Sequence, residues 1–366
     1  MMRCSRVIAI LVGCVVFTGA AAQAEDATGV VYNDANRNGV RDAGERGVPD
    51  VLISNGRDVV ATNKTGHYTI PVTSDTTVFL IKPREWMTPV GPGNNIPRFY
   101  YNHRPNGSPK MTYQGVAPTG PLPASIDFPL HKQRESGKFR VVCFGDTQTR
   151  DMEEVHFLAH DILEAVQGTS AAFGITLGDN VFNDLTVFEP LVETMSGTGI
   201  PWRYVPGNHD HNHDAPTVED TDDSFTRVFG PSYYAFNYGS VHFIVLNDIR
   251  HDAGKDNYHG GLGECQFAFI KNDLSYVSPK QLVVLLMHIP IMELDEAKSL
   301  YALLKDFPYT FSLSAHTHDQ KHVFVDKTGG WLQETPHHHL IHGTACGSWW
   351  GGNFSEVGIP MTTMSD

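Results

Sequence analysis

The feature that most constrains the fold is an alternation of short apolar runs and amphipathic runs between residues 138 and 345. Short apolar runs predict buried strands, and apolar residues spaced three and four apart predict helices. The predicted strands are 139–144, 173–177, 202–205, 233–238, 241–246, 281–287 and 309–314, and the predicted helices are 152–166, 186–195, 264–276 and 295–304. This order predicts an α/β fold with central sheet layers.

Polar residues directly follow five of these strands. The groups are Gly145-Asp146-Thr147-Gln148, Gly178-Asp179-Asn180, Gly207-Asn208-His209-Asp210, Met287-His288 and Ala315-His316-Thr317-His318. A lone Asp at a strand end usually caps a turn or helix, and a lone His is usually an interior residue. Ligands of α/β sheets gather beyond the carboxyl ends of the strands. Five such groups therefore indicate one shared site.

The third group combines two chemical roles in adjacent residues. The amide oxygen of Asn208 can bind a metal, and the ring of His209 can give up a proton. We expect a metal ligand beside a general acid at this strand end.

The ordered groups resemble the signature of the calcineurin-like metallophosphoesterases, which is Asp-x-His, Gly-Asp, Gly-Asn-His-Asp/Glu, His and Gly-His-x-His. The resemblance covers roughly residues 138–345 and implies a four-layer β-sandwich flanked by helices. Two residues depart from the signature, because Gln148 stands where His is usual and Ala315 where Gly is usual. The flanking regions resemble a secreted bacterial subgroup that adds an immunoglobulin- or transthyretin-like β domain in front.

The resemblance implies two metal positions that share Asp179. The first is assigned to Asp146, Gln148, Asp179 and His318, and the second to Asp179, Asn208, His288 and His316. Two divalent cations about 3.5–4 Å apart need a shared anionic ligand, and together they clamp both oxygens of an in-line displacement by a bridging hydroxide. Such mixed ligands suit manganese, iron or zinc, and the harder oxygen of Gln148 favours manganese or iron.

The resemblance also assigns the catalytic proton. His209 would protonate the leaving oxygen, and Asp210 would hold its ring in the useful orientation. Other polar residues are expected to have structural roles: His211 and His213 in a solvated loop, and Asp184 as a loop-structuring carboxylate. Residues 337–339 are three consecutive histidines in strand-like surroundings, so at most one or two of them could reach the site.

The sequence therefore predicts a secreted, dinuclear-metal phosphoesterase. Its substrate would be a small phosphorylated molecule or a phosphorylated glycan or lipid headgroup, and the choice between monoester and diester stays open because no Arg or Lys is assigned to the site. One alternative is a non-catalytic cell-surface binding module on a degenerate phosphatase scaffold, which Gln148 keeps open. Another is a two-metal peptidase or amidase, which the ordered block at residues 207–210 disfavours.

Residues 25–131 differ in texture, with many Gly, Pro, Asn and Thr residues and short alternating runs. Runs at 29–32, 50–54, 67–70 and 77–81 predict a small all-β sandwich domain. The Pro-rich segment 82–130 could be a linker, but its interleaved aromatic residues favour packing onto a neighbour. We place the domain boundary at residues 131–137.

A twelve-residue segment within this region matches a calcium-binding loop. Its ligand positions are Asp34, Asn36, Asn38, the carbonyl of Val40, Asp42 and Glu45, with Gly39 at the sharp turn. An ordinary turn rich in Asn, Asp and Gly is the alternative interpretation. Because strands and not helices flank the loop, we expect a calcium ion that rigidifies the domain.

The N-terminal residues indicate export. Basic Arg3 and Arg6, an apolar run at 7–17 and small residues at 22–24 predict a signal peptide over residues 1–24, and therefore a secreted or periplasmic protein. Lipoprotein anchoring through Cys14 is an alternative. We interpret residues 346–366 as the stub of a further domain.

Charge and cysteine content exclude several other classes. The net charge of −14 disfavours binding to nucleic acid or to an anionic membrane, and no apolar run suits a transmembrane span. Cys143, Cys265 and Cys346 remain after the predicted leader, are far apart and imply no disulfide framework. Cys143 is expected to be a buried strand residue. The sequence does not predict the oligomeric state.

Overall fold

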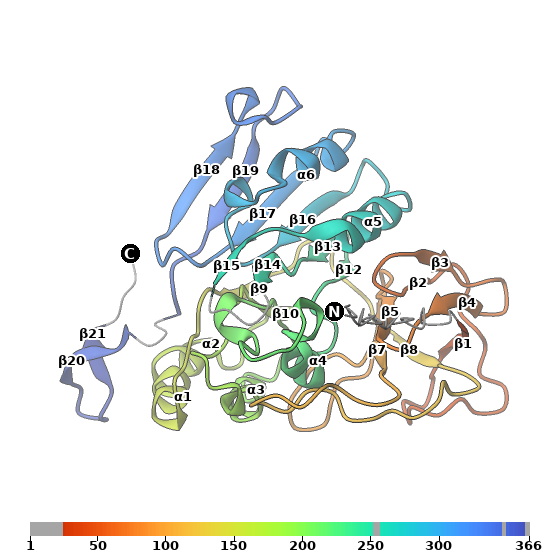
Figure 1. The fold of residues 1–366 in the computed structure, drawn as a ribbon, viewed down its shortest axis with the longest axis horizontal. Helices are drawn as coiled ribbons and strands as arrows, with labels where there is room; N and C mark the ends of the chain where they lie inside the picture. Colours follow the sequence, from red (N-terminus) through yellow and green to blue (C-terminus); the bar gives the residue numbers. More distant parts are fainter. Residues whose placement is uncertain (1–24, 252–256, 346–348, 363–366) are drawn as a thin grey trace, which may run out of the picture.

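The computed structural model describes residues 25–251, 257–345 and 349–362 (Figure 1). The predicted leader and Cys346 lie outside these described residues. The described chain is a mixed α/β protein with several sheets, as predicted. None of its helices is both long and apolar enough to cross a membrane.

Two sheets form the middle of the region that follows residue 138. One has the strand order β11-β10-β9 and is parallel, and the other has the order β12-β13-β16-β17-β19-β18 with antiparallel strands at its two edges. The strands are β9 Val141–Phe144, β10 Phe173–Thr176, β11 Trp202–Arg203, β12 Tyr234–Tyr238, β13 Val241–Val245, β16 Leu282–Leu286, β17 Thr310–Ser314, β18 Lys321–Val325 and β19 His337–Ile341. A separate hairpin pairs β14 Ile249–His251 with β15 Tyr258–Gly260.

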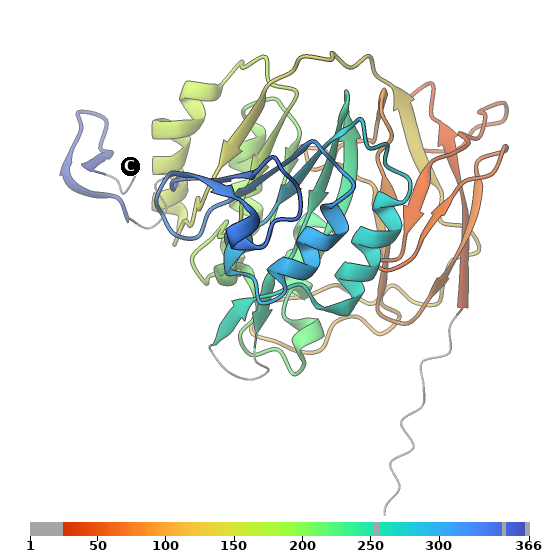
Figure 2. The same ribbon diagram turned by 90° about the horizontal axis from the view of Figure 1, so that it is seen from above.

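Helices cover the outer faces of both sheets (Figures 1 and 2). They are α1 Met152–Leu158, α2 Glu164–Val166, α3 Phe188–Ser196, α4 Asp223–Phe229, α5 Gly263–Leu274 and α6 Ala297–Leu304, with a π-helical turn at Ala159–Leu163 joining α1 to α2. Phe188 and Phe225 share one apolar cluster with Trp202 of β11, whereas Phe269 and Leu300 share another with the six-stranded sheet. The layer order is therefore helix, sheet, sheet, helix.

Aromatic rings fill the space between the two sheets. Phe173 of β10 lies 5.5 Å from both Phe236 of β12 and Phe243 of β13, edge to face in each case. Such pairs are a stable packing of aromatic side chains. Cys143 of β9 is a free thiol whose burial raises its pKa to about 12, which fits its predicted role as a packing residue.

The regular structure of described residues 25–132 is confined to strands, which form two four-stranded sheets. Their orders are β4-β1-β8-β6 and β3-β2-β5-β7. The strands are β1 Glu25–Asn33, β2 Leu52–Ser54, β3 Val59–Ala61, β4 His67–Val72, β5 Thr76–Ile81, β6 Trp86–Met87, β7 Tyr100–His103 and β8 Phe128–Lys132. Exposed and buried residues alternate strictly along β4, which is the period of a strand with one solvated face.

The two regions share one continuous apolar core. Phe79 of β5 packs edge to face on Phe269 of α5 at 5.5 Å, and Phe99 lies 5.0 Å from Tyr234 of β12. Lys82, directly after β5, forms a parallel bridge with Phe236, and the N–H of Asn237 donates to the Lys82 carbonyl at 2.8 Å. We call this contact the seam between the regions.

The Pro-rich segment packs onto the region that follows residue 138, as its aromatic residues predicted. Both the N–H and the hydroxyl of Thr112 donate to Asp214, at 2.8 and 2.9 Å. The carbonyl of Gln114 accepts from the hydroxyl of Ser224 and from Nε of Arg227, each at 2.9 Å. The segment is therefore part of the fold.

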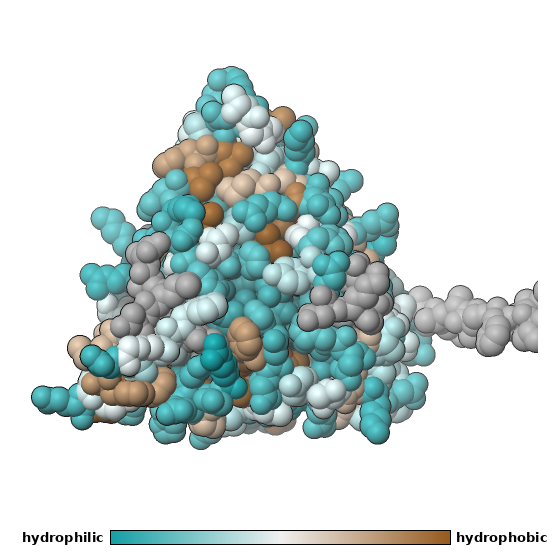
Figure 3. All heavy atoms as spheres, turned by 60° about the vertical axis from the view of Figure 1, so that its left-hand side comes forward, coloured by the Kyte–Doolittle hydropathy of each residue, from teal (hydrophilic) through white to brown (hydrophobic). Residues whose placement is uncertain are grey.

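A short hairpin ends the described chain, formed by β20 Gly351–Phe354 and β21 Pro360–Thr362. Phe354, Val357 and Met361 are exposed on it. Figure 3 shows the side of the molecule brought forward from the left of Figure 1, where hydrophobic patches interrupt a largely hydrophilic surface. Trp350 packs on Phe157 of α1, with ring centroids 5.7 Å apart.

The three consecutive histidines of β19 lie on alternate faces, as the strand period predicted. His337 and His339 are buried and form a ladder with hydroxyls of β17. His337 bonds Thr310 and Ser312 at 2.8 and 2.7 Å, and His339 bonds Ser312 and Ser314 at 2.6 and 2.9 Å. Burial lowers the pKa of His337 to about 4 and that of His339 to about 3. Both rings are therefore neutral in the folded protein.

This ladder predicts acid sensitivity. Below about pH 6.5 the unfolded chain protonates these rings and the folded chain does not, so the free energy of unfolding falls as the pH drops towards 4. Between pH 7.5 and 5.5 each ring accounts for about 1 kcal/mol of that fall. Urea unfolding of metal-free His339→Gln should show a fall smaller by that amount, whereas His338→Gln, which changes a far less buried ring, should stay closer to the wild type. Equal falls in all three proteins would contradict the assignment.

Candidate metal centre

The carboxyl ends of strands from both sheets bring the predicted ligands together. Asp146 follows β9, Asp179 follows β10, and His288 and His316 follow β16 and β17. Among the described residues, Asp179, His288 and His316 are the one group of His, Cys, Asp or Glu side chains whose ligand atoms all lie within 4.8 Å of one another. With Asn208, which lies after β11, five separate chain segments supply the predicted ligands.

The residues predicted for the second metal converge on one point. Nε2 of His288 lies 3.1 Å from Oδ1 of Asn208, 3.2 Å from Oδ2 of Asp179 and 3.2 Å from Nδ1 of His316. Nδ1 of His288 lies 2.8 Å from the carbonyl oxygen of Leu177, which fixes its proton on that nitrogen. Nε2 is therefore the nitrogen that is placed to bind a metal.

The residues predicted for the first metal also lie close to one another. Nε2 of Gln148 is 3.4 Å from Oδ2 of Asp179, and Nε2 of His318 is 3.6 Å from Oδ1 of Asp146. A rotation of the Gln148 amide by 180° would turn its oxygen toward the same space, and the two orientations are nearly isosteric. All four residues can thus contribute to one position with Asp179 shared.

The backbone at these residues is strained. Asp146, Gln148, Asp179, His316 and His318 have φ angles of 33°, 42°, 47°, 71° and 62°, in the left-handed region. For residues other than glycine this conformation costs about 1–3 kcal/mol each and persists only where the surroundings impose it. Its concentration at five predicted ligands marks the centre as a functional site.

Two glycines of the motif allow the strands to approach closely. A Cβ added to Gly178 would lie 2.4 Å from Nδ1 of His288, and one added to Gly207 would lie 2.1 Å from the backbone nitrogen of Asp179. Real Cβ atoms do not come so close, and Gly178 also has a φ of 93°. Glycine is therefore required before Asp179 and before Asn208, because any side chain there would clash.

Opposite charges in the centre shift the pKa values of its groups. Burial lowers the pKa of His288, but the carboxylates of Asp179, Asp146 and Asp248 outweigh it and raise that pKa to about 10. Burial raises the pKa of Asp179, and the adjacent His288 outweighs it, so the pKa of this carboxyl falls below its usual range. Burial dominates at Asp146, whose pKa rises. Without a cation, a proton on His288 balances the carboxylates.

These groups fit divalent transition metals. Asp146 Oδ1 is buried and has no hydrogen bond among the described residues, its contact with His318 being long. Three imidazoles, two carboxylates and two amides form a set that manganese, iron or zinc accepts more readily than calcium does. Metal binding would displace the proton on His288, so affinity would rise with pH.

The structure corrects the predicted partner of His209. Nδ1 of His209 lies 2.7 Å from Oδ1 of Asn183, so Asn183 orients the ring. The Asp210 carboxylate instead accepts backbone N–H groups of Asn180, Val181 and Gly207. Asp210 therefore holds the loops together and does not touch the ring. The resemblance named Asp210 for this contact, whereas its carboxylate accepts the N–H of Gly207 within the turn.

Several residues of the centre were not predicted. Asp248, buried after β13, accepts the N–H of His288 at 3.2 Å and of Ile289 at 2.8 Å, which positions the ligand. Phe182 stacks on His209 with ring centroids 4.5 Å apart, and the Arg150 guanidinium lies 5.4 Å from the Phe182 ring centroid. Asp248 followed a predicted strand, which was a usable signal. For Arg150, the only signal in the sequence was its position two residues after Gln148.

The remaining candidate residues have varied surroundings. His211 is buried, contrary to the expected solvated loop, and bonds Thr221 at 3.2 Å. His213 lies 3.4 Å from Asn183, beside the centre. Asp184 structures its loop by capping the turn at residues 185–187, as predicted. Trp349 packs edge to face on His318, with ring centroids 5.6 Å apart.

The predicted calcium loop, residues 34–45, directly follows β1 and is distant in sequence from the predicted metal ligands. Its oxygens already accept hydrogen bonds: Asp34 accepts from the N–H groups of Asn38 and Gly39, and Glu45 from those of Ala35 and Asp42. Among the described residues, the three carboxylates of the loop do not fall within 4.8 Å of one another. The side-chain amides of Asn36 and Asn38 both donate to Asp42, which keeps three ligand positions in contact.

Comparison with known families agrees with this geometry. The model described as "N terminal of Calcineurin-like phosphoesterase" matches residues 35–115, and the model "Calcineurin-like phosphoesterase" matches residues 139–320. The two matches together span well over half of the chain. The chain belongs to the calcineurin-like phosphoesterase family. The second match contains every predicted metal ligand from Asp146 to His318.

Individual relatives of this calcineurin-like phosphoesterase match over shorter stretches. Serine/threonine-protein phosphatase CPPED1 of Pongo abelii is 32% identical over 120 residues, which are 32% of this chain and 35% of the relative. A probable rhamnogalacturonate lyase B of Neosartorya fischeri is 35% identical over 66 residues, 18% of this chain and 9% of the relative. The chain thus spans only about a third or less of the length of these relatives.

A solved structure, a dimetal phosphatase from Danio rerio, is 13% identical with a TM-score of 0.42. The similarity covers 57% of this chain and 88% of that one.

The ligand assignment predicts a metal stoichiometry. Chelated and then manganese-loaded protein should retain two equivalents by elemental analysis after gel filtration, because two positions are predicted around Asp179. Asp179→Asn should retain less than one equivalent, since it alters the ligand that both positions share. Asp184→Asn, a change on the same loop, should retain two. Two equivalents in Asp179→Asn would contradict the shared role.

Proposed function

We propose that this protein hydrolyses the phosphoric ester of a small phosphorylated molecule, glycan or lipid headgroup with two divalent cations held at the centre. The observation that supports it most is the convergence of Asp179, Asn208, His288 and His316 on one point, with His209 beside them. When bound, two cations activate water and neutralise charge on phosphoryl oxygens. The first position is assigned to Asp146, Gln148 and His318 with Asp179.

His209 is the proposed donor of a proton to the leaving oxygen. The backbone N–H of His209 donates to Oδ1 of Asp179 at 2.9 Å. The ring nitrogen Nε2 lies 4.0 Å from Oδ2 of the same carboxylate and therefore faces the ligands. Asn183 accepts from Nδ1, and Phe182 stacks on the ring. The ring is thus fixed on one face and at one nitrogen, which general acid catalysis requires.

The surroundings of His209 also supply a cation that sequence reasoning did not assign. The guanidinium of Arg150 lies over the ring of Phe182, and this ring stacks on His209. The guanidinium is therefore close to the centre. A guanidinium recognises phosphate oxygens by paired hydrogen bonds. This arrangement favours a phosphomonoester over a diester, because a monoester has an additional charged oxygen to bind.

The proposal predicts metal-dependent turnover of chromogenic esters. Manganese-loaded protein should hydrolyse an aryl phosphomonoester faster than the matched bis-aryl phosphodiester, and chelated protein should hydrolyse neither. His209→Ala should keep its metals yet lose about 10²-fold or more in kcat on an alkyl monoester, whose leaving group needs the proton. Absence of metal-dependent turnover of both esters would favour the non-catalytic binding module.

Variants at Asn183 separate ring orientation from loop structure. Asn183 has a φ of 63°, which Gly and Asp tolerate. Asn183→Gly removes the acceptor for Nδ1 and should lower kcat about 10-fold on the alkyl ester, with metal content unchanged. Asn183→Asp retains an acceptor and should lose much less. Equal activity of the Gly variant and the wild type would show that the acceptor is dispensable.

Two further proposals concern the setting of the enzyme. Export is proposed from residues 1–24 alone, which lie outside the described residues. The loop from Asp34 to Glu45 is proposed to bind calcium, because the type of every ligand residue matches and Asp34 already wraps around the turn at Gly39. Calcium at this loop would rigidify the first region at a distance from the chemistry.

The calcium proposal predicts a stability effect without loss of chemistry. Millimolar Ca²⁺ should raise the Tm of the wild type by a few degrees, because a ligand that binds only the folded state stabilises it. Glu45→Gln should abolish most of that rise and leave kcat unchanged, whereas Asp58→Asn, in a different turn, should behave as the wild type. A full calcium response in Glu45→Gln would refute the loop assignment.

A further inference from the structure

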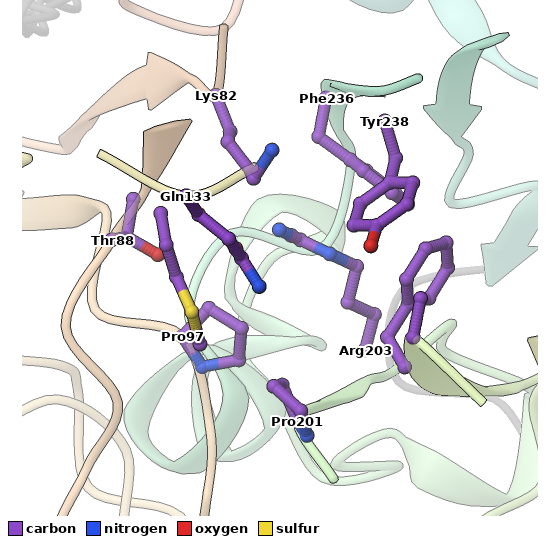
Figure 4. Close-up of a pocket in the computed structure, with 11 residues that line it drawn as sticks. Lys82, Thr88, Pro97, Gln133, Pro201, Arg203, Phe236 and Tyr238 are labelled. Atoms are coloured by element: carbon purple, nitrogen blue, oxygen red, sulfur yellow. The ribbon is translucent and has the colours of Figure 1, made fainter. Parts of the chain in front are cut away.

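A small pocket lies at the seam, away from the metal centre. Its cavity of about 30 Å³ is lined by residues of both regions, among them Lys82, Thr88 and Gln133 from the first and Arg203 and Tyr238 from the second. Figure 4 shows the side chains of Lys82, Gln133 and Arg203 converging on the same space. By this measure one water needs about 10–15 Å³, so the cavity holds two waters or one small polyatomic group.

Arg203 is a buried cation without a counter-ion. It is 6% exposed, and its guanidinium forms no ion pair with any carboxylate of the described residues. It stacks 3.8 Å from the ring centroid of Phe236 and donates a hydrogen bond to the hydroxyl of Tyr234. A guanidinium has five N–H donors, and Arg203 lines the cavity. A buried unpaired charge is costly.

A second cation adds to the positive potential of the pocket. Nζ of Lys82 pairs with Glu135 at 2.5 Å and donates to the carbonyl of Asn237 at 2.9 Å. Burial, with a smaller contribution from the charge of Arg203, outweighs the opposing effect of Glu135 and lowers the pKa of Lys82 to about 8. Glu135 balances Lys82 alone, so the pocket keeps one net positive charge.

We propose that the seam pocket binds a small oxyanion, with the chemistry of inorganic phosphate, between Arg203 and Gln133. The flat fork of a guanidinium matches two oxygens of such an ion, and the amide of Gln133 and hydroxyl of Thr88 offer neutral donors. Met87 and Gln133 are only half-buried, which gives solvent access. The ion would link the end of β8 to β11 and so stabilise the contact between the regions.

The test is the Tm of metal-free protein as a function of inorganic phosphate, at constant ionic strength set with NaCl. Chelation removes the cations through which phosphate would bind the metal centre. The wild type should gain about 3 °C at saturating phosphate. Arg203→Met should gain nothing. Arg227→Met, which alters an arginine paired with Glu189 outside the pocket, should gain as much as the wild type.

A second variant keeps the proposal testable if Arg203→Met does not fold. Gln133→Leu changes a half-buried side chain, leaves Arg203 in place and should need about 10-fold more phosphate for the same gain. Turnover of metal-loaded Gln133→Leu should equal that of the wild type. A phosphate response that is absent in the wild type, or unchanged in Arg203→Met and Gln133→Leu, would overturn the proposal.

Discussion

The carboxylate of Asp179 is the group on which the catalytic region depends. One oxygen accepts the N–H of His209, and the other lies within 3.4 Å of ring or amide nitrogens of His288 and Gln148. A single negative charge thus fixes the loop of the proposed acid and faces both metal positions. The strained backbone at Asp179 is tolerated because three chain segments close around it.

Much of the site could be predicted because its chemistry-bearing residues follow apolar strands in a fixed order. The strands align those residues at one sheet edge whatever the length of the helices between them. Asn183 could not be predicted, because its contact with His209 depends on a left-handed residue in a loop 26 positions away. Asp210 was assigned to that contact through the family resemblance, which says little about the direction of its side chain in a tight turn.

The fold shows the same division between local and long-range information. Periodicity predicted the alternate faces of residues 337–339, but not the hydroxyls of β17 that bond two of these histidines across 25 to 27 residues. The predicted boundary at residues 131–137 marked a change of composition. Local composition could not predict that Phe79 and Phe269 would pack together and make the two regions one core.

The parallel bridge between Lys82 and Phe236 bears on how the chain folds during its synthesis. β12 is an edge strand of the six-stranded sheet, and an uncovered edge is a template for pairing with other chains. The first region shields that edge and buries aromatic rings of β12 and α5. During synthesis the shield emerges from the ribosome before the edge it protects. Because the N-terminal region is made first, it can cover the β12 edge as soon as that edge forms and so reduce aggregation.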